Sequence, residues 1–352
     1  MSFAWERVDA LLDKLDVDLA RAHGLGPLAA RRRRLRGEQV PEPLALEERS
    51  AATAHLIAPT ILTHARAAYD GKLVLLKGPE ITIRYPSRAR RFGDLDLLAD
   101  DAEAAQAGLL ANGFELEDRE WPPPGYEDAD AHYHLHPLQW PGLPLNVEIH
   151  REVKWPPGLE APPNDEIFSE AVPSSIGIDG LLTPPPHQHA VLLAAHAWGE
   201  IPLRTIREVI DVMVFADEAD RADMTRVAER WGLGRAWRST IDVGDWLLDG
   251  GKKPMSVRLW ARHLAALREP KVIEMHIERW LSPFWMFSPG RAVARSARAV
   301  ANDFTPAPDE TWRDKRRQTL RALSHPFSQK SEHERRSGRE IRRRIRRSSP
   351  RE

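Results

Sequence analysis

Three acidic side chains stand where two buried strands would bring them together. Asp94 and Asp96 are two residues apart in the run GDLDLLAD, and Glu148 lies in the run NVEIH. Side chains alternate along a strand, so Asp94 and Asp96 project from one face while the leucines between and after them enter the core. Two carboxylates this close repel each other unless a cation neutralises them. Their oxygen atoms are hard ligands, which predicts a Mg²⁺ or Mn²⁺ site.

The segment before these acids carries groups that suit a polyphosphate. Gly78 follows the apolar run LVLL and Lys77, and a residue without a side chain lets a phosphate approach the backbone. A helix beginning at Pro79 would add free N–H groups and its dipole to the attraction for an anion. Four arginines crowd the stretch between this glycine and the acids, at positions 84, 88, 90 and 91. Such side chains form charge-assisted hydrogen bonds with phosphate oxygens.

The elements that must position these groups follow from the periodicity of apolar residues. Helical spacing predicts helices, and short apolar runs predict buried strands. The sequence also predicts a helix that follows the second strand and ends at Gly113, and a long proline-rich connection before a wholly helical half. The expected helices before the strands cover residues 2–22 and 44–69, the expected strands lie within 73–76, 95–99, 132–140 and 143–150, and the connection covers 155–186.

Composition sets limits on the chemistry. The chain has 352 residues and no cysteine, which excludes disulfides, thiolate catalysis and cysteine-ligated metal sites. The N-terminal segment is amphipathic and acidic, unlike a signal peptide, and no apolar run reaches the roughly 18 residues that span a bilayer. We therefore expect a cytoplasmic protein without a transmembrane segment.

Charge is distributed unevenly. Residues 313–352 hold 15 of the 51 Lys and Arg residues but only 5 of the 52 Asp and Glu residues, which leaves 36 against 47 in the rest of the chain. Such a basic tail can dock on nucleic acid or on an anionic membrane. It can equally be a solvated helix end, or it can fold back on its own acidic body.

The run LKGPEITIRYPSRARRFGDLDLLADDAEAAQAGLLANGFE resembles the signature of the bacterial "uncharacterised nucleotidyltransferase" family, a member of the DNA polymerase beta-like nucleotidyltransferase superfamily. The shared features are a Leu-Lys-Gly strand end, a Tyr-Pro pair, an arginine, the Gly-Asp-Leu-Asp run and a later strand ending in acid-hydrophobic-His. A downstream helix with His196, followed by Arg204 and Asp211, is also similar to the family.

This resemblance implies an α+β fold with a small mixed β-sheet flanked by helices and followed by a helical region. Together with the residue pattern and the charge distribution, it leads us to expect four segments, which are N-terminal helices (1–70), a catalytic core (71–180), a helical domain (181–312) and the basic tail (313–352). In the superfamily, two metal ions bridge three carboxylates and a nucleoside triphosphate, and pyrophosphate is released.

The resemblance also assigns roles to residues. The metal ligands and catalytic acids would be Asp94, Asp96 and Glu148, holding Mg²⁺ or Mn²⁺. The nucleotide-binding residues would be Lys77, Gly78, Arg91, Gly93 and Arg204. The acceptor could be a small molecule, a protein side chain or an RNA end.

Several alternatives stay open at this level. Arg204 could reach a triphosphate or pair with Asp211, and His150 could line the site or only end its strand. His196 is expected to be a hydrogen-bonded core histidine. The alternating histidines at 132, 134 and 136 are expected on an exposed edge strand rather than around a metal. The whole chain could also be an inactive nucleotide-binding or regulatory module with the same fold.

Overall fold

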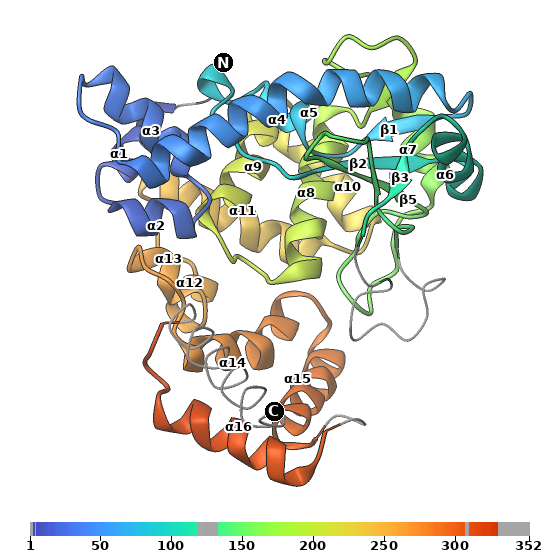
Figure 1. Ribbon diagram of the computed structural model, residues 1–352. Coiled ribbons are helices and arrows are strands. Elements are labelled where there is room, and N and C mark those ends of the chain that lie inside the picture. Colours follow the sequence, from blue (N-terminus) through green and yellow to red (C-terminus); the bar gives the residue numbers. More distant parts are fainter. Residues whose placement is uncertain (1–2, 4, 119–120, 122–132, 307–309, 330–352) are drawn as a thin grey trace, which may run out of the picture. The chain divides into compact units, whose positions relative to one another are not determined.

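The computed structural model describes residues 3, 5–118, 121, 133–306 and 310–329. The chain divides into two compact units, residues 1–244 and 245–352. The first contains a mixed sheet with flanking helices, and the named elements of the second are helices (Figure 1). The predicted α+β class is therefore confirmed. The division of the chain into the four segments expected from the sequence stays a prediction.

The first unit contains one seven-stranded sheet with the strand order β3-β4-β5-β2-β1-β7-β6. The central strand β2 runs antiparallel to β1 and parallel to β5, and β1 runs parallel to β7. The strands are β1 (Leu73–Leu75), β2 (Asp94–Ala99), β3 (Glu115–Leu116), β4 (Leu138–Gln139), β5 (Asn146–His150), β6 (Val172–Pro173) and β7 (Leu181–Thr183).

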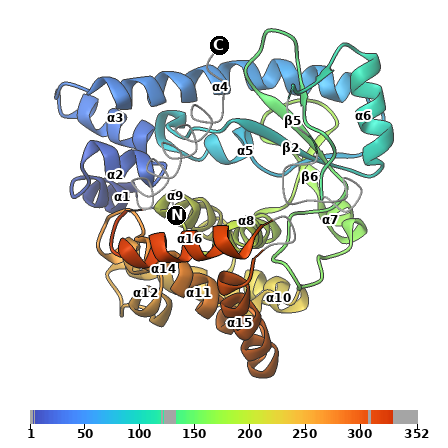
Figure 2. The ribbon, with the colours of Figure 1, turned by 60° about the horizontal axis from the view of Figure 1, so that its bottom comes forward.

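Some helices of the first unit flank this sheet, and α1, α2 and α3 lie beyond it near one end of α4 (Figures 1 and 2). The helices of this unit are α1 (Trp5–Leu12), α2 (Val17–Ala22), α3 (Gly26–Leu35), α4 (Glu42–Ala67), α5 (Pro79–Thr82), the 3₁₀ helix η1 (Pro86–Arg88), α6 (Ala102–Ala111), α7 (Asn164–Glu170), α8 (Pro186–Glu200), α9 (Ile206–Ala216) and α10 (Arg221–Arg230). Helix α11 (Gly234–Asp249) contains the division between the units. The second unit has α12 (Met255–Leu259), α13 (Arg262–Ala265), α14 (Val272–Leu281), the 3₁₀ helix η2 (Ser282–Trp285), α15 (Pro289–Phe304) and α16 (Trp312–Ser324).

The apolar face of the sheet packs against α4 and α6. Their small and branched side chains join the inward-facing residues of β1, β2 and β5 in one buried cluster. Leu95, Leu97, Val147 and Ile149 are each fully buried, so the intervening acids must lie on the opposite face. Helix α6 begins as the sequence predicts, because the side chain of Asp101 accepts a hydrogen bond from the backbone N–H three residues later.

Helix α8 is attached to the carboxyl end of β1. His189 donates a hydrogen bond from Nε2 to the carbonyl oxygen of Leu76 across 2.6 Å. The hydroxyl of Thr183, at the end of β7, donates to the carbonyl oxygen of Leu75 across 3.2 Å. These buried contacts hold the first turns of the helical region against the end of the strand that leads into Lys77.

Two expectations about local structure were wrong. The helix expected over residues 2–22 is two helices, because the side chain of Asp16 accepts from the N–H of Leu19 and starts α2. The proline-rich connection contains two short strands, β6 and β7, which extend the sheet beyond β1. Within the described residues, every helix is too short or too polar to cross a membrane. The basic tail lies mostly outside those residues, from position 330 onward.

Candidate metal and nucleotide site

The register of β2 and β5 brings two of the three predicted acids together. Asp96 pairs directly with Glu148, and Asp94 pairs with Asn146. Residues directly opposite each other on parallel strands point to the same face of the sheet. The Asp96 side chain is buried, with 1% of its surface exposed, whereas Glu148 is 16% exposed. The acids therefore lie on one face, with Asp96 deepest.

A histidine completes the tightest group of possible metal-binding side chains. Ligand atoms of Asp96, Glu148 and His150 all lie within 4.8 Å of one another. His150 Nε2 is 3.1 Å from Oδ1 of Asp96 and 3.9 Å from Oε2 of Glu148. His150 thus lines the site rather than merely ending its strand. Asp94 does not belong to this group in the described part of the chain.

Lys77 is the positive charge of the cluster. Its ammonium lies 3.0 Å from Oδ1 of Asp96 and 2.9 Å from Nε2 of His196 on α8. An ammonium group only donates hydrogen bonds, so Nε2 of His196 accepts and the ring is neutral. Burial and the charge of Lys77 accordingly lower the pKa of His196 well below its ordinary value. We expect from the sequence a hydrogen-bonded core histidine at position 196, and this contact agrees with it, although the residue as a whole is half-buried.

The pKa values of the neighbouring acids Asp96 and Asp94 are shifted in opposite directions. Burial opposes the charge of Asp96, but the Lys77 ammonium and the hydrogen bond from His150 outweigh it and hold the pKa of Asp96 well below its usual range. The charge of Asp96, together with burial, raises the pKa of Asp94. Because Asp96 is ionised, its Oδ1 accepts the hydrogen bond and His150 Nε2 donates it. Oδ2 of Asp96 is buried and has no hydrogen-bond partner in the described residues.

Gly78 has the conformation that a close approach to β2 requires. Its φ is 67° and its ψ is −125°, a region that side-chain-bearing residues rarely adopt. A Cβ atom at this position would lie 3.2 Å from the backbone oxygen of Asp94 and 3.3 Å from Leu95 Cδ2. Helix α5 begins at Pro79, as expected, but has only four residues.

Two of the four arginines in the connecting segment, Arg84 and Arg90, are bonded to acidic side chains of the protein. Arg90 is buried and donates two hydrogen bonds to Asp211 on α9, from Nε to Oδ1 across 2.7 Å and from its terminal nitrogen to Oδ2 across 2.8 Å. The Tyr85 hydroxyl donates to the same Oδ1 across 2.6 Å. Arg84 binds Glu80 and Glu218. The guanidinium groups of Arg84 and Arg90 therefore bind neighbouring elements of the protein, which favours a structural role over phosphate binding.

The remaining predicted nucleotide-binding residues are on the surface. Arg91 and Gly93 are exposed directly before the strand that carries Asp94. Arg204 is exposed in the segment between α8 and α9. Both oxygen atoms of Asp211 are bonded to Arg90. Burial opposes the charge of Glu200 at the end of α8, but Lys154, and to a smaller extent Lys77 and Arg204, outweigh it and lower the pKa of Glu200. A nucleotide-binding role for Arg91, Gly93 and Arg204 stays a prediction.

The alternating histidines do not form an exposed face. His134 is buried, and its Nε2 lies 3.6 Å from Oε2 of Glu148. The Nε2 of His136 donates to the carbonyl oxygen of Glu117 across 2.9 Å. The edge-strand expectation was wrong for His134 because an isolated bridge pairs it with His150 and draws it into the sheet. Residue 132 lies outside the described residues.

A family described as "Uncharacterised nucleotidyltransferase" matches residues 13–249. The chain belongs to this family. The match covers the candidate site and nearly all of the first unit, and it ends five residues after the division at Gly244. No curated protein matches the chain. At a coarse level, the family assigns the chain to the nucleotidyltransferases, and a cluster of two carboxylates and an imidazole could hold a metal ion.

Proposed function

We propose that this protein transfers a nucleoside monophosphate from a nucleoside triphosphate to an acceptor hydroxyl, with release of pyrophosphate. The observation that carries the proposal is the side-by-side placement of Asp96 and Glu148 on the polar face of the sheet, with Lys77 bonded to Asp96. Membership of the nucleotidyltransferase family supports the same reaction class.

The residues present fit a divalent cation. The Asp96 Oδ2 atom is buried without a hydrogen-bond partner, and a carboxylate oxygen left in that state is costly unless a cation or donor meets it. The group whose ligand atoms lie within 4.8 Å of one another includes the carboxylates of Asp96 and Glu148, and small side-chain rotations would bring these two onto a single ion with bonds of about 2 Å. Asp94, Asp96 and Glu148 would hold Mg²⁺ or Mn²⁺, which would neutralise the phosphate oxygens and polarise the reacting phosphoryl group.

Side chains of the protein would orient the metal ligands, bind the phosphates and accept the proton of the attacking hydroxyl. His150 donates to Asp96 and fixes the orientation of that carboxylate. Lys77 holds a permanent positive charge beside the acids, because Asp96 and Asp94 overcome the effect of burial and raise its pKa. That charge is in a position to bind a phosphate oxygen. Glu148 is the more exposed of the paired acids and would accept the proton of the attacking hydroxyl. Arg91 and Arg204 would bind the outer phosphates.

The experiment measures pyrophosphate release and transfer of α-labelled nucleotide from each of the four ribonucleoside triphosphates, with Mg²⁺ or Mn²⁺ and a cell extract as the source of acceptor. We expect transfer from one triphosphate in the wild type and its loss in Asp94→Asn/Asp96→Asn. The matched control is Asp18→Asn, which changes an acid whose side chain is 92% exposed. Nucleotide binding by calorimetry without any transfer would instead support the inactive binding module. Labelled RNA among the products would identify a nucleic-acid acceptor.

A further inference from the structure

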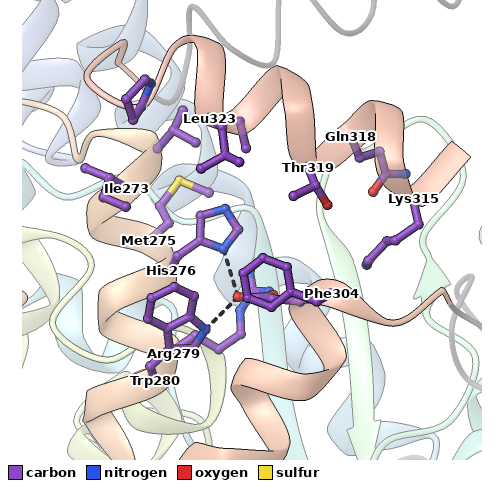
Figure 3. Close-up of a pocket in the computed structure, with 14 residues that line it drawn as sticks. Ile273, Met275, His276, Arg279, Trp280, Phe304, Lys315, Gln318, Thr319 and Leu323 are labelled. Atoms are coloured by element: carbon purple, nitrogen blue, oxygen red, sulfur yellow. Dashed lines mark hydrogen bonds and ion pairs between the residues drawn. The ribbon is translucent and has the colours of Figure 1, made fainter.

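The second unit contains a cavity that the nucleotidyltransferase site does not use. It has a volume of about 430 Å³ and lies among α14, α15 and α16 (Figure 3). That size is within the range of pockets that bind small molecules. The lining is mainly apolar and includes the rings of Trp280 and Phe304, the thioether of Met275 and the side chains of Ile273 and Leu323.

One polar group in this cavity is held in a fixed orientation. The Asp303 side chain, 6% exposed, accepts hydrogen bonds from His276 Nδ1 across 2.8 Å and from Trp280 Nε1 across 2.7 Å. Arg279 bonds the other oxygen of the same carboxylate. Donation from Nδ1 makes Nε2 of a neutral His276 a hydrogen-bond acceptor. Figure 3 shows this second nitrogen directed away from the carboxylate, on the side of Thr319 and Leu323.

The charges around the cavity are already paired. Arg279 is bonded to Asp303, and the ammonium of Lys315 lies 3.7 Å from a carboxylate oxygen of Glu310. A ligand with a full charge would therefore gain little attraction. The aromatic rings and the thioether favour a flat, polarisable body. The Nε2 atom of His276, whose ring Asp303 holds in place, favours one hydroxyl group at the edge of that body.

We propose that this cavity binds a small, uncharged, aromatic molecule of one or two rings, whose hydroxyl group forms a hydrogen bond with His276 Nε2. The ring system packs between Trp280, Phe304 and Met275, and Asp303 keeps the imidazole facing the ligand. This site is independent of the proposed transfer reaction, because none of its residues belongs to the first unit.

The test compares two probes of nearly the same shape, 2-naphthol and 2-methylnaphthalene, by calorimetric titration of the full chain. We expect 2-naphthol to bind about 3- to 10-fold more tightly, as one net hydrogen bond allows. His276→Phe should abolish this preference while leaving 2-methylnaphthalene bound. Ala322→Phe, which places a ring in the cavity, should weaken both probes at least 10-fold, and Arg298→Ala, an exposed change on α15, should alter neither.

Any of three results would overturn the proposal. One is the absence of binding by either probe to the wild type. The second is a preference for 2-naphthol that persists in His276→Phe, and the third is an affinity that Ala322→Phe leaves unchanged. Thermal unfolding of each variant verifies that the second unit is still folded, and Ala322→Phe tests the location of binding even if His276→Phe is unstable.

Discussion

The ammonium of Lys77 lies 2.9 Å from Nε2 of His196, although 119 positions of the chain separate the two residues. The contact joins the end of β1 to α8 and places a neutral imidazole behind the cation that faces Asp96. Lys77 is therefore positioned from two sides, by an acid of the sheet and by a base of the helical region.

Replacing Lys77 with methionine keeps the length of the side chain and removes its charge. We expect Lys77→Met to lower kcat/KM for the triphosphate about 10- to 100-fold, because a hydrogen bond from a charged group to phosphate is lost. Pyrophosphate release at varied triphosphate concentration measures the effect. Lys72→Met, at an exposed position five residues earlier, is the control. Unchanged kinetics in Lys77→Met would show that the ammonium does not contact the substrate.

A methyl group at Gly78 should disturb both the turn and the first acid. Gly78→Ala forces a side chain into an unfavourable φ of 67° and places its Cβ 3.2 Å from the backbone oxygen of Asp94. We expect a loss of about 1–3 kcal/mol in the free energy of unfolding. Gly37→Ala, with a φ of 68° and no atom within 4 Å of the new Cβ, controls for strain alone. Urea unfolding measures the loss in both variants. Equal losses of unfolding free energy would show that the contact between the new Cβ and the Asp94 oxygen adds nothing to the backbone strain.

The buried pair of Arg90 and Asp211 should be strongly coupled. Arg90→Met or Asp211→Asn alone leaves an unpaired buried group and should cost about 3–5 kcal/mol. The double variant should lose clearly less than the two single losses combined, because neither partner is then stranded. A double-mutant cycle by denaturant unfolding measures the coupling. The exposed pair of Arg226 and Asp223 is the control and should couple by at most about 1 kcal/mol. Additive losses at Arg90 and Asp211 would contradict this account.

Glu278 on α14 should make the stability of the second unit dependent on pH. Burial raises the pKa of its carboxyl from 4.5 to about 7. Between these values the folded unit binds a proton that the unfolded chain releases, so stability falls as pH rises through this window and is lowest above it. We expect Glu278→Gln to remove a difference of about 1–3 kcal/mol between pH 5 and pH 8. Thermal unfolding at both pH values tests this, with Glu42→Gln at an exposed side chain as control. The same pH dependence in wild type and Glu278→Gln would contradict it.

The local parts of the site could be predicted from the sequence. The alternation in Asp-Leu-Asp-Leu and in Val-Glu-Ile-His defines which side chains enter the core, and the buried leucines and valine of β2 and β5 follow that pattern. A helix after Asp101 and a turn at Gly78 also depend on residues that are close in the sequence. Those features therefore needed no knowledge of the tertiary structure.

The parts that depend on distant contacts could not be predicted. Among four neighbouring arginines, nothing in the sequence singles out Arg90 as the partner of Asp211, because 121 positions separate them. The burial of His134 depends on its bridge to His150, and the strands β6 and β7 are too short to leave a periodic pattern. Whether Asp94 joins Asp96 and Glu148 around a metal depends on side-chain rotations that spacing alone does not specify.

Because Asp96 pairs directly with Glu148, the proposed transfer reaction would depend on the correct register of β2 and β5. A shift of β5 by one residue along β2 would turn Glu148 to the core and place Val147 or Ile149 among the acids. Molecules trapped in that arrangement would keep most of their secondary structure, so their circular dichroism spectrum would hardly differ from that of the native protein. They would nevertheless be inactive. During refolding, the recovery of turnover should therefore lag behind the recovery of secondary structure by the time that strand pairing takes to correct itself.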